Sequence, residues 1–348
     1  MDAMQFVPIL LVGFAASLGF TPVSRRIAMR LGVVDKPNQR KIHHDHKPMM
    51  GGLAIYGALV ISLLLFSPPQ YLKEFAAILA GAAFLAIVGL LDDRYNLGIR
   101  IRLVAMTLAS LGLVASGISI QLFKSPWIDI PLTVFWVLTV TNAANFMDNM
   151  DGLTAGFTAI AAAYFVVIAF SQGLTLVTSL AAALAGSAVG FLIYNFNPAS
   201  VFMGDMGALV LGFLLAVLGI KLKFGTQPLN VTWMIPILVL ALPLFDITLV
   251  VVTRLMEGRS PAQAGKDHTS HRLMSIGFSQ RQTIFILYGA CIIFGFIGVL
   301  VGAAPPDIAL RVGIAALCFL AVLFLLMMWI RARYQKPTTP PPQQSPQP

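Results

Sequence analysis

The sequence predicts an all-α fold, a polytopic bundle of about eleven transmembrane helices. Of its 348 residues, 58% are hydrophobic and only 11% are charged, whereas soluble domains carry about 25% charged residues. The mean hydropathy is +0.85, and apolar stretches of roughly 17 to 25 residues, long enough to cross a bilayer, recur along nearly the whole chain. We therefore expect a single transmembrane domain over residues 1–333 and a disordered Pro/Gln-rich tail over residues 334–348.

Polar, Gly-marked and Pro-marked breaks separate the candidate spans. The fifth and eighth spans run into polar sequence, so ten spans is the alternative count. The first span has no basic residue ahead of its apolar run, and we interpret it as a span rather than a cleaved signal peptide. In chain order, the expected spans are approximately residues 4–24, 51–67, 74–91, 103–122, 129–145, 155–172, 176–194, 206–221, 231–253, 282–301 and 308–330.

Positive charge is distributed unevenly between the two sets of loops. If the loop after the first span is cytoplasmic, eighteen Lys and Arg residues fall on that side and five on the other. Cytoplasmic loops carry the excess of Lys and Arg, which places the amino terminus outside and the carboxyl terminus in the cytoplasm. All five His residues fall on the cytoplasmic side, so we expect chemistry there. The net charge of +9 then indicates orientation and contact with anionic lipid, and no nucleic-acid partner is expected.

The segment NAANFMDNMDGL brings amides and carboxylates to the end of the fifth span. Asn142, Asn145, Asp148 and Asp151 recur every three residues and therefore stay near one helical face. Their oxygens suit Mg²⁺, which takes one or two protein ligands and leaves the rest to phosphate and water. The competing interpretation is a polar helix end with Gly152 as its C-cap.

Two further loops carry acids. In LLDDRYNLGIRIRL, Asp92 and Asp93 end the third span and point about 100° apart on a helix. One is expected to face the site while the other pairs with Arg94 or caps the next segment; an exposed turn is the alternative. In YNFNPASVFMGDMGALVLGF, Asp205 lies among small residues that let a bulky ligand approach the backbone, or it is a simple helix N-cap.

Two loops are basic and contain His. GRSPAQAGKDHTSHRLMSIGFSQRQ places His268 and His271 three residues apart beside Arg272, and no other His or Cys lies nearby to complete a zinc site. A phosphate-binding patch is favoured, with a solvated basic loop as the alternative. DKPNQRKIHHDHKPMMGGL either binds anionic lipid or a nucleotide phosphate, or only sets the topology. Its candidate ligands are Arg40, Lys41 and His43.

Oxygens for Mg²⁺ and cationic groups for phosphate are thus expected on one face of the bundle, which is the combination that phosphoryl transfer requires. The five loop motifs, in this order, resemble those of the polyprenyl-phosphate N-acetylhexosamine-1-phosphate transferase family, or glycosyltransferase family 4, which includes the MraY, WecA and TagO types. The resemblance covers residues 35–282, and the ordered set is far more specific than any single motif.

The resemblance implies an enzyme of the bacterial cytoplasmic membrane with its active site on the cytoplasmic face. Such enzymes transfer a sugar 1-phosphate from a UDP-N-acetylhexosamine to undecaprenyl or another polyprenyl phosphate and release UMP, as the first membrane step of a cell-envelope polysaccharide pathway. The lipid phosphate oxygen attacks the β-phosphorus, and Mg²⁺, or Mn²⁺ in its place, screens the pyrophosphate. Family members are often dimers, so a homodimer is a further expectation.

The motifs also imply roles for individual residues. Asp205 matches the Mg²⁺-binding Asp of the family, and Asn145 matches an Asn that joins it in some members. Asp92 and Asp93 match a pair of acids with roles in lipid-phosphate activation or substrate binding. The other catalytic matches are Asp148, His268 and His271, and the other substrate-binding matches are Asn142, Asp151, Gly152, Asn195, Phe202 and Arg272.

The sequence departs from the family pattern in two places. Asn149 replaces the first Gly of DGxDG, and the His loop reads His-Thr-Ser-His-Arg rather than three consecutive His or His-Ile-His-His. The second departure, together with DKPNQRKIH, favours the WecA/TagO type and an N-acetylglucosamine-like donor over a peptidyl-muramic donor.

Two other functions remain open at this point. A Mg²⁺-dependent intramembrane prenyltransferase needs two Asp-rich repeats, of which only residues 142–151 have that character. A lipid or sugar transporter places its functional groups near the bilayer midplane. Asp246, two turns before Arg254 in the ninth span, is the feature that a transporter explains better; otherwise it supports the site from behind or pairs with another helix.

Overall fold

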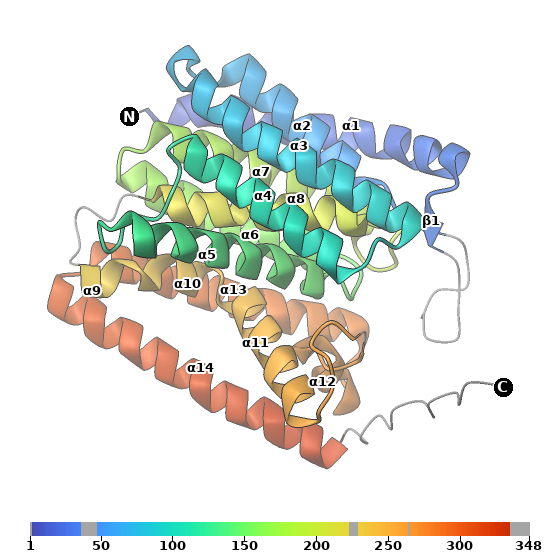
Figure 1. Ribbon diagram of the computed structural model, residues 1–348, viewed down its shortest axis with the longest axis vertical. Coiled ribbons are helices and arrows are strands. Elements are labelled where there is room, and N and C mark those ends of the chain that lie inside the picture. The colour runs from blue at the N-terminus through green and yellow to red at the C-terminus, as the bar shows by residue number, and fades with distance from the viewer. Residues whose placement is uncertain (1, 36–46, 223–228, 264, 335–348) are drawn as a thin grey trace.

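Helices make up most of the computed structural model, which describes residues 2–35, 47–222, 229–263 and 265–334. Two short strands, β1 (Val34–Asp35) and β2 (Lys47–Pro48), pair antiparallel, and two 3-10 turns, Ala3–Phe6 and Pro69–Tyr71, precede α1 and α3. Figure 1 shows the helices stacked side by side. They are α1 (Val7–Leu31), α2 (Gly51–Phe66), α3 (Leu72–Tyr95), α4 (Ile99–Ala115), α5 (Pro126–Met147), α6 (Leu153–Ser171), α7 (Thr175–Asn195), α8 (Gly204–Lys221), α9 (Leu229–Thr232), α10 (Met234–Val239), α11 (Ala241–Met256), α12 (Thr269–Ser275), α13 (Gln280–Ala303) and α14 (Pro306–Tyr334).

The all-α polytopic membrane fold is confirmed. Within the described ranges, eight helical stretches are long and apolar enough to cross a bilayer: α1, α3, α5, α6, α7, α8, α13 and α14, the first and second including their preceding turns. Helix α2 is apolar but has 16 residues, and α4 has 17. Each of the eleven expected spans contains a helix. The count of eleven spans, the outside amino terminus and the single domain stay predictions, and the tail expected to be disordered lies outside the described residues.

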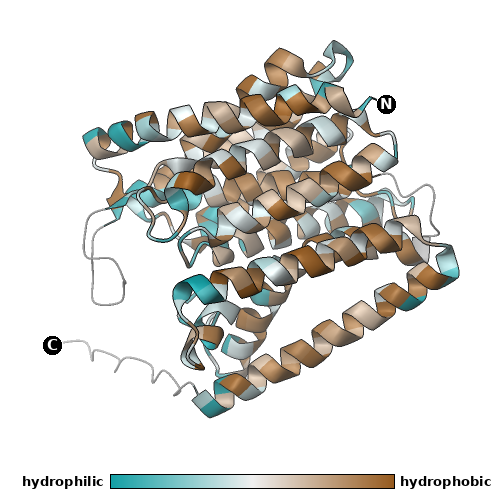
Figure 2. Cartoon of the chain, turned by 180° about the vertical axis from the view of Figure 1, so that it is seen from behind, coloured by the Kyte–Doolittle hydropathy of each residue, from teal (hydrophilic) through white to brown (hydrophobic). Residues whose placement is uncertain are grey.

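Helices α7 and α8 form the centre of the bundle. The most apolar stretch of α8 is 89% buried and that of α7 is 83% buried. Helix α8 packs between α3 and α5, while α7 packs against α1 and α6. In Figure 2 hydrophobic residues fill the middles of the helices and hydrophilic residues collect at their ends. Most polar groups that could carry chemistry therefore lie at the helix ends.

Three glycines bring α2, α3 and α8 together near the start of α8. A Cβ atom on Gly52 would lie 2.3 Å from the backbone nitrogen of Gly207, and one on Gly89 would lie 2.5 Å from the Cα of Met206. Such close backbone approach is possible only without a side chain. The end of α3 and the beginnings of α2 and α8 therefore share one corner of the bundle.

The ninth expected span is broken into α9, α10 and α11, whereas the sequence predicted one continuous helix over residues 231–253. Proline explains both breaks, because its ring clashes with the carbonyl four residues earlier and it lacks an N–H donor. The carbonyl that precedes Pro236 by four belongs to Thr232, where α9 ends. The one that precedes Pro243 belongs to Val239, where α10 ends.

Candidate active site

Four acids from three helix ends gather at one end of the bundle. Asp92 and Asp93 lie in the last turn of α3, Asp148 follows the last residue of α5, and Asp205 lies in the first turn of α8. Asp205 interacts electrostatically with each of the other three. The loops that follow α3 and α5 and the loop that precedes α8 lie at the same end of the bundle, so acids far apart in the sequence meet there.

Asp93 faces the backbone of α8. Its Oδ1 accepts a hydrogen bond from the backbone N–H of Asp205 at 2.9 Å, and its Oδ2 accepts one from Met206 at 3.3 Å. The first N–H groups of a helix have no partner within it. The expectation that one acid of this pair caps a segment therefore holds for Asp93, but the capped helix is α8 rather than the next helix in the chain.

Asp92 pairs with Arg102 rather than with Arg94. Arg102 Nη1, from the first turn of α4, lies 3.1 Å from Asp92 Oδ2 and 3.0 Å from Asp205 Oδ2, whereas Arg94 donates to the carbonyl of Leu31. Sequence reasoning did not select Arg102 as a site residue. Its position in the DDRYNLGIRIR motif could have identified it, because both acids of that motif belong to the site.

The amides of α5 separate into two environments. Asn145 Nδ2 donates to Asp205 Oδ1 at 2.5 Å, so this amide lies among the acids. Asn142 Nδ2 instead donates to the carbonyl of Leu138 at 2.8 Å and contacts Met106 on α4. The structure thus joins Asn145 to the carboxylates but does not bring Asn142 into contact with them.

Negative charge is in excess at this corner. Burial, together with the nearby carboxylates of Asp205 and Asp151, raises the pKa of Asp148 to about 7. Asp92 Oδ1 is buried and has no hydrogen-bond partner among the described residues. One guanidinium, that of Arg102, bridges two of the four acids, so the carboxylates would attract a further cation.

Asp151, Gly152 and Asn195 hold two loops together. Asp151 Oδ2 accepts hydrogen bonds from the backbone N–H of Ala199 at 2.9 Å and from Asn197 at 3.2 Å. Asn195 Oδ1 accepts the N–H of Gly152 at 3.1 Å. Gly152, with φ +78°, is the N-cap of α6, whereas the C-cap of α5 is Asp148. Phe202 lies on the same loop and is tied by its backbone to Pro48.

His268 is held by Asp246. Asp246 Oδ2 lies 2.8 Å from His268 Nδ1, and its Oδ1 accepts the backbone N–H of Thr269 at 2.6 Å. Asp246 is 1% exposed, so a buried carboxylate on α11 orients the imidazole from behind. Such a partner favours a proton on Nδ1 and leaves Nε2 for a ligand. Of the two roles left open for Asp246, the structure shows the supporting one.

The second imidazole, that of His271, lies beside the first, with ring centroids 6.0 Å apart. Burial lowers the pKa of His271 to about 4, and the neighbouring His268 and Lys266 act in the same direction. His271 is therefore neutral at neutral pH and offers a hydrogen bond rather than a charge.

Arg272 is fully buried and does not face the acids. Its three donor nitrogens bond to the carbonyls of Asp267 and Met327 and to Thr253 Oγ1. Burial lowers its pKa to about 10. These contacts fasten α12 to α11 and α14, which differs from the phosphate-gripping position that the sequence implied. Arg40, Lys41 and His43 lie outside the described residues.

Asp267 forms the second anchor of this segment. It makes ion pairs with Arg254 at 3.0 Å, Arg259 at 2.8 Å and Arg331 at 2.7 Å. Burial alone would raise the pKa of Asp267, but hydrogen bonds from the three arginines outweigh it and hold the pKa far below its usual range. Sequence reasoning did not select this acid, because its partners come from three separate elements.

A membrane helix bundle with acids, an amide and two imidazoles at its helix ends is typical of one class of protein, the integral membrane enzymes. The model of the family described as glycosyl transferase family 4 matches residues 75–223. A probable undecaprenyl-phosphate N-acetylglucosaminyl 1-phosphate transferase of Bacillus subtilis is 32% identical over 92% of this chain and 91% of its own length. The chain therefore belongs to this family of polyprenyl-phosphate N-acetylhexosamine-1-phosphate transferases.

Two further relatives agree. An undecaprenyl-phosphate alpha-N-acetylglucosaminyl 1-phosphate transferase of Yersinia pestis is 28% identical over 82% of each chain. A decaprenyl-phosphate N-acetylglucosaminephosphotransferase of Mycolicibacterium smegmatis is 30% identical over 87% of this chain and 84% of its own length. The resemblance inferred from the five motifs is thus confirmed at the level of the family.

Proposed function

We propose that this protein transfers N-acetylglucosamine 1-phosphate from UDP-N-acetylglucosamine to a polyprenyl phosphate. An oxygen of the lipid phosphate forms a bond to the β-phosphorus, the bond from that phosphorus to the bridging oxygen breaks, and UMP leaves with the bridging oxygen. The products are UMP and a polyprenyl-diphospho-sugar. The observation that carries the proposal is the meeting of Asp92, Asp93, Asp148 and Asp205 with Asn145 at one end of the bundle.

Mg²⁺ fits this cluster. Asp205 and Asn145 would hold the ion, with Asp148 as an alternative partner for Asp205. Two protein ligands are sufficient, because Mg²⁺ takes one or two of them and completes its shell with phosphate oxygens and water. When bound, the ion neutralises charge on the pyrophosphate; Mn²⁺ would serve in its place.

Side chains of the protein bind the two substrates. The imidazoles of His268 and His271, from the other side of the bundle end, bind the diphosphate or the sugar. We assign the reception of the lipid phosphate to Asp92 and its ion-pair partner Arg102. Arg102 would release one acid and take up the incoming phosphate, since guanidinium groups bind phosphate well.

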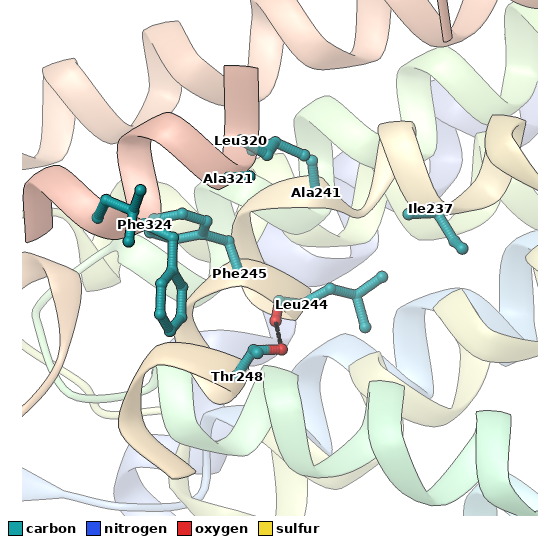
Figure 3. A pocket seen from close by; sticks show the side chains of 9 residues that line it. Ile237, Ala241, Leu244, Phe245, Thr248, Leu320, Ala321 and Phe324 are labelled. Carbon is teal, nitrogen blue, oxygen red and sulfur yellow. Dashed lines mark hydrogen bonds between the residues drawn. The ribbon is translucent and has the colours of Figure 1, made fainter. Parts of the chain in front are cut away.

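The prenyl chain has an apolar surface available. A groove of roughly 500 Å³ lies between α10, α11 and α14 and is lined by hydrophobic residues and Thr248. Figure 3 shows Leu244 and Phe245 on one wall and Phe324 on the other. Helix α11 also carries Asp246, so one helix lines the groove and holds His268. We further propose a bacterial cytoplasmic membrane location, with the site on the cytoplasmic face, from the distribution of Lys and Arg.

Radiolabelled UDP-N-acetylglucosamine, undecaprenyl phosphate and Mg²⁺ test the proposal with the purified protein. Labelled lipid and one UMP per transfer are expected. UDP-N-acetylgalactosamine and UDP-N-acetylmuramoyl-pentapeptide complete the donor panel. Failure to form labelled lipid, with transfer from an allylic diphosphate instead, would identify a prenyltransferase and refute the proposal.

The variant Asp205→Asn tests whether Asp205 is needed for turnover as a metal ligand or only for folding. Turnover should be lost while the melting temperature changes little, because the substitution keeps the size of the side chain. Near-normal turnover at saturating Mg²⁺ would refute the role of Asp205.

A further inference from the structure

One side-chain hydrogen bond joins the two segments that carry the acids and the imidazoles. We call residues 148–152 the acidic loop and residues 267–272 the His segment. Ser270 Oγ donates to Asn149 Oδ1 at 2.7 Å, across 121 residues of sequence. Asn149 Nδ2 in turn donates to the carbonyl of Phe146 at the end of α5, also at 2.7 Å. The amide nitrogen of Asn149 is thus bonded to α5, and its amide oxygen accepts a hydrogen bond from the His segment.

The hydrogen bond between Ser270 and Asn149 lies in buried, packed surroundings. Ser270 is 1% exposed, and a buried hydroxyl that loses its acceptor is costly because water cannot replace it. The ring of Phe146 packs edge-on against the ring of His268, with centroids 5.9 Å apart. The guanidinium of Arg254 lies 5.7 Å from the centre of the same Phe146 ring. The end of α5 is therefore the surface on which the His segment rests.

The other anchors of the His segment do not reach the acids. Asp246 holds His268 from α11, and the arginine contacts of Asp267 lead to α11, α14 and its own loop. Among the hydrogen bonds of the described residues, the Ser270–Asn149 bond is the side-chain link between the His segment and the acidic loop. Asn149 directly follows Asp148, so a shift of Asn149 displaces the acids relative to His268.

We propose that Asn149 and Ser270 are positioning residues whose hydrogen bond sets the distance between the acidic loop and the imidazoles, and thereby the binding of the nucleotide sugar. This inference rests on the proposed function, in which one donor molecule contacts both segments. The phosphate of the lipid acceptor does not need that distance, because its proposed contacts, Asp92 and Arg102, lie on α3 and α4.

A double-mutant cycle tests the pair in the full-length protein. Asn149→Ala and Ser270→Ala are each expected to raise the KM for UDP-N-acetylglucosamine about tenfold, while kcat and the KM for undecaprenyl phosphate stay within about twofold. The double variant should show the same tenfold increase rather than a hundredfold one, because the bond is lost only once. A hundredfold increase, or unchanged KM values in the single variants, overturns the inference.

Ser275→Ala is the matched control. Ser275 lies on the same short helix, but its hydroxyl donates to the carbonyl of Arg272 within that helix at 2.7 Å. Its KM for the nucleotide sugar should equal that of the wild type. A tenfold increase in this variant as well would mean that any loss of a hydroxyl from α12 has the same effect, and the specific link would be refuted.

A second measurement does not depend on turnover. In hydrogen–deuterium exchange, Ser270→Ala should accelerate exchange in both α12 and residues 146–152, and Ser275→Ala should not affect residues 146–152. Acceleration confined to α12 overturns the link. If the wild type forms no labelled lipid, the proposed function fails, and exchange alone then decides whether the two segments are coupled.

Discussion

The carboxylate of Asp93 accepts hydrogen bonds from the backbone N–H groups of Asp205 and Met206, at 2.9 and 3.3 Å. The end of α3 and the start of α8 are thereby one structural unit. A hydrogen-bond acceptor at this position is favourable because the first N–H groups of a helix have no partner within it. Both oxygens of Asp93 are engaged with the backbone, which makes Asp93 a residue that places Asp205.

Asp93→Ala should lower thermal stability and turnover together. Removing the cap leaves two buried N–H groups without an acceptor, which costs about 1 to 3 kcal/mol. Differential scanning fluorimetry and the lipid-transfer assay measure the two effects. Asp93→Asn keeps one acceptor oxygen and should lie between the wild type and Asp93→Ala in both measurements. A wild-type melting temperature for Asp93→Ala would contradict the capping role.

Arg102→Met should lower the Mg²⁺ concentration needed for half-maximal binding by several-fold. The guanidinium bridges Asp92 and Asp205 and repels a second cation at the same oxygens. Isothermal titration without substrate measures this affinity. Arg94→Met is the control, because Arg94 bonds to the Leu31 carbonyl and should leave Mg²⁺ binding unchanged. Weaker Mg²⁺ binding in Arg102→Met would show that Arg102 supports the metal site instead.

Arg272→Lys should destabilise the protein without weakening nucleotide-sugar binding. Lysine cannot reproduce three donors in a plane, so at least one of the buried acceptors on Asp267, Met327 and Thr253 loses its partner, at about 1 to 3 kcal/mol each. We expect a lower melting temperature and an unchanged KM for UDP-N-acetylglucosamine in the folded fraction. A raised KM at an unchanged melting temperature would restore the phosphate-binding role that the sequence implied.

The stability of the protein should depend on pH through His271. Its folded pKa of about 4 lies below the ordinary value of 6.5, so the unfolded chain takes up the proton first. The contribution of His271 to stability is therefore fully present above pH 6.5 and is lost as the pH falls toward 4. Melting temperatures of the wild type and His271→Gln between pH 8 and pH 4 measure it. The melting temperature of the wild type should fall more steeply; parallel curves would refute a neutral, partly buried His271.

Hydropathy was sufficient to predict the helices, because a bilayer requires long apolar segments. It also predicted that the acids converge, since the loops around Asp92, Asp148 and Asp205 were assigned to one side. The sequence prediction of one continuous ninth helix is wrong, although Pro236 and Pro243 are residues that break helices.

The individual contacts required the structure. Asp92 and Asp93 are adjacent and identical, and only the position of α8 shows that one caps a helix while the other meets Arg102. Arg272 belongs to a motif that implies phosphate binding, but the packing of α11 and α14 around it decides its partners. The departures at Asn149 and Ser270 were visible in the sequence, whereas their contact depends on two segments 121 residues apart.

The glycine contacts among α2, α3 and α8 have a consequence for how this scaffold can diversify. At Gly52, Gly89 and Gly207 the wall beside Asp205 consists of main chain from neighbouring helices, and a single added methyl group meets backbone atoms within 3 Å. Point mutations cannot remodel such a wall gradually. A change of donor or acceptor specificity is therefore expected to arise at residues other than these three glycines.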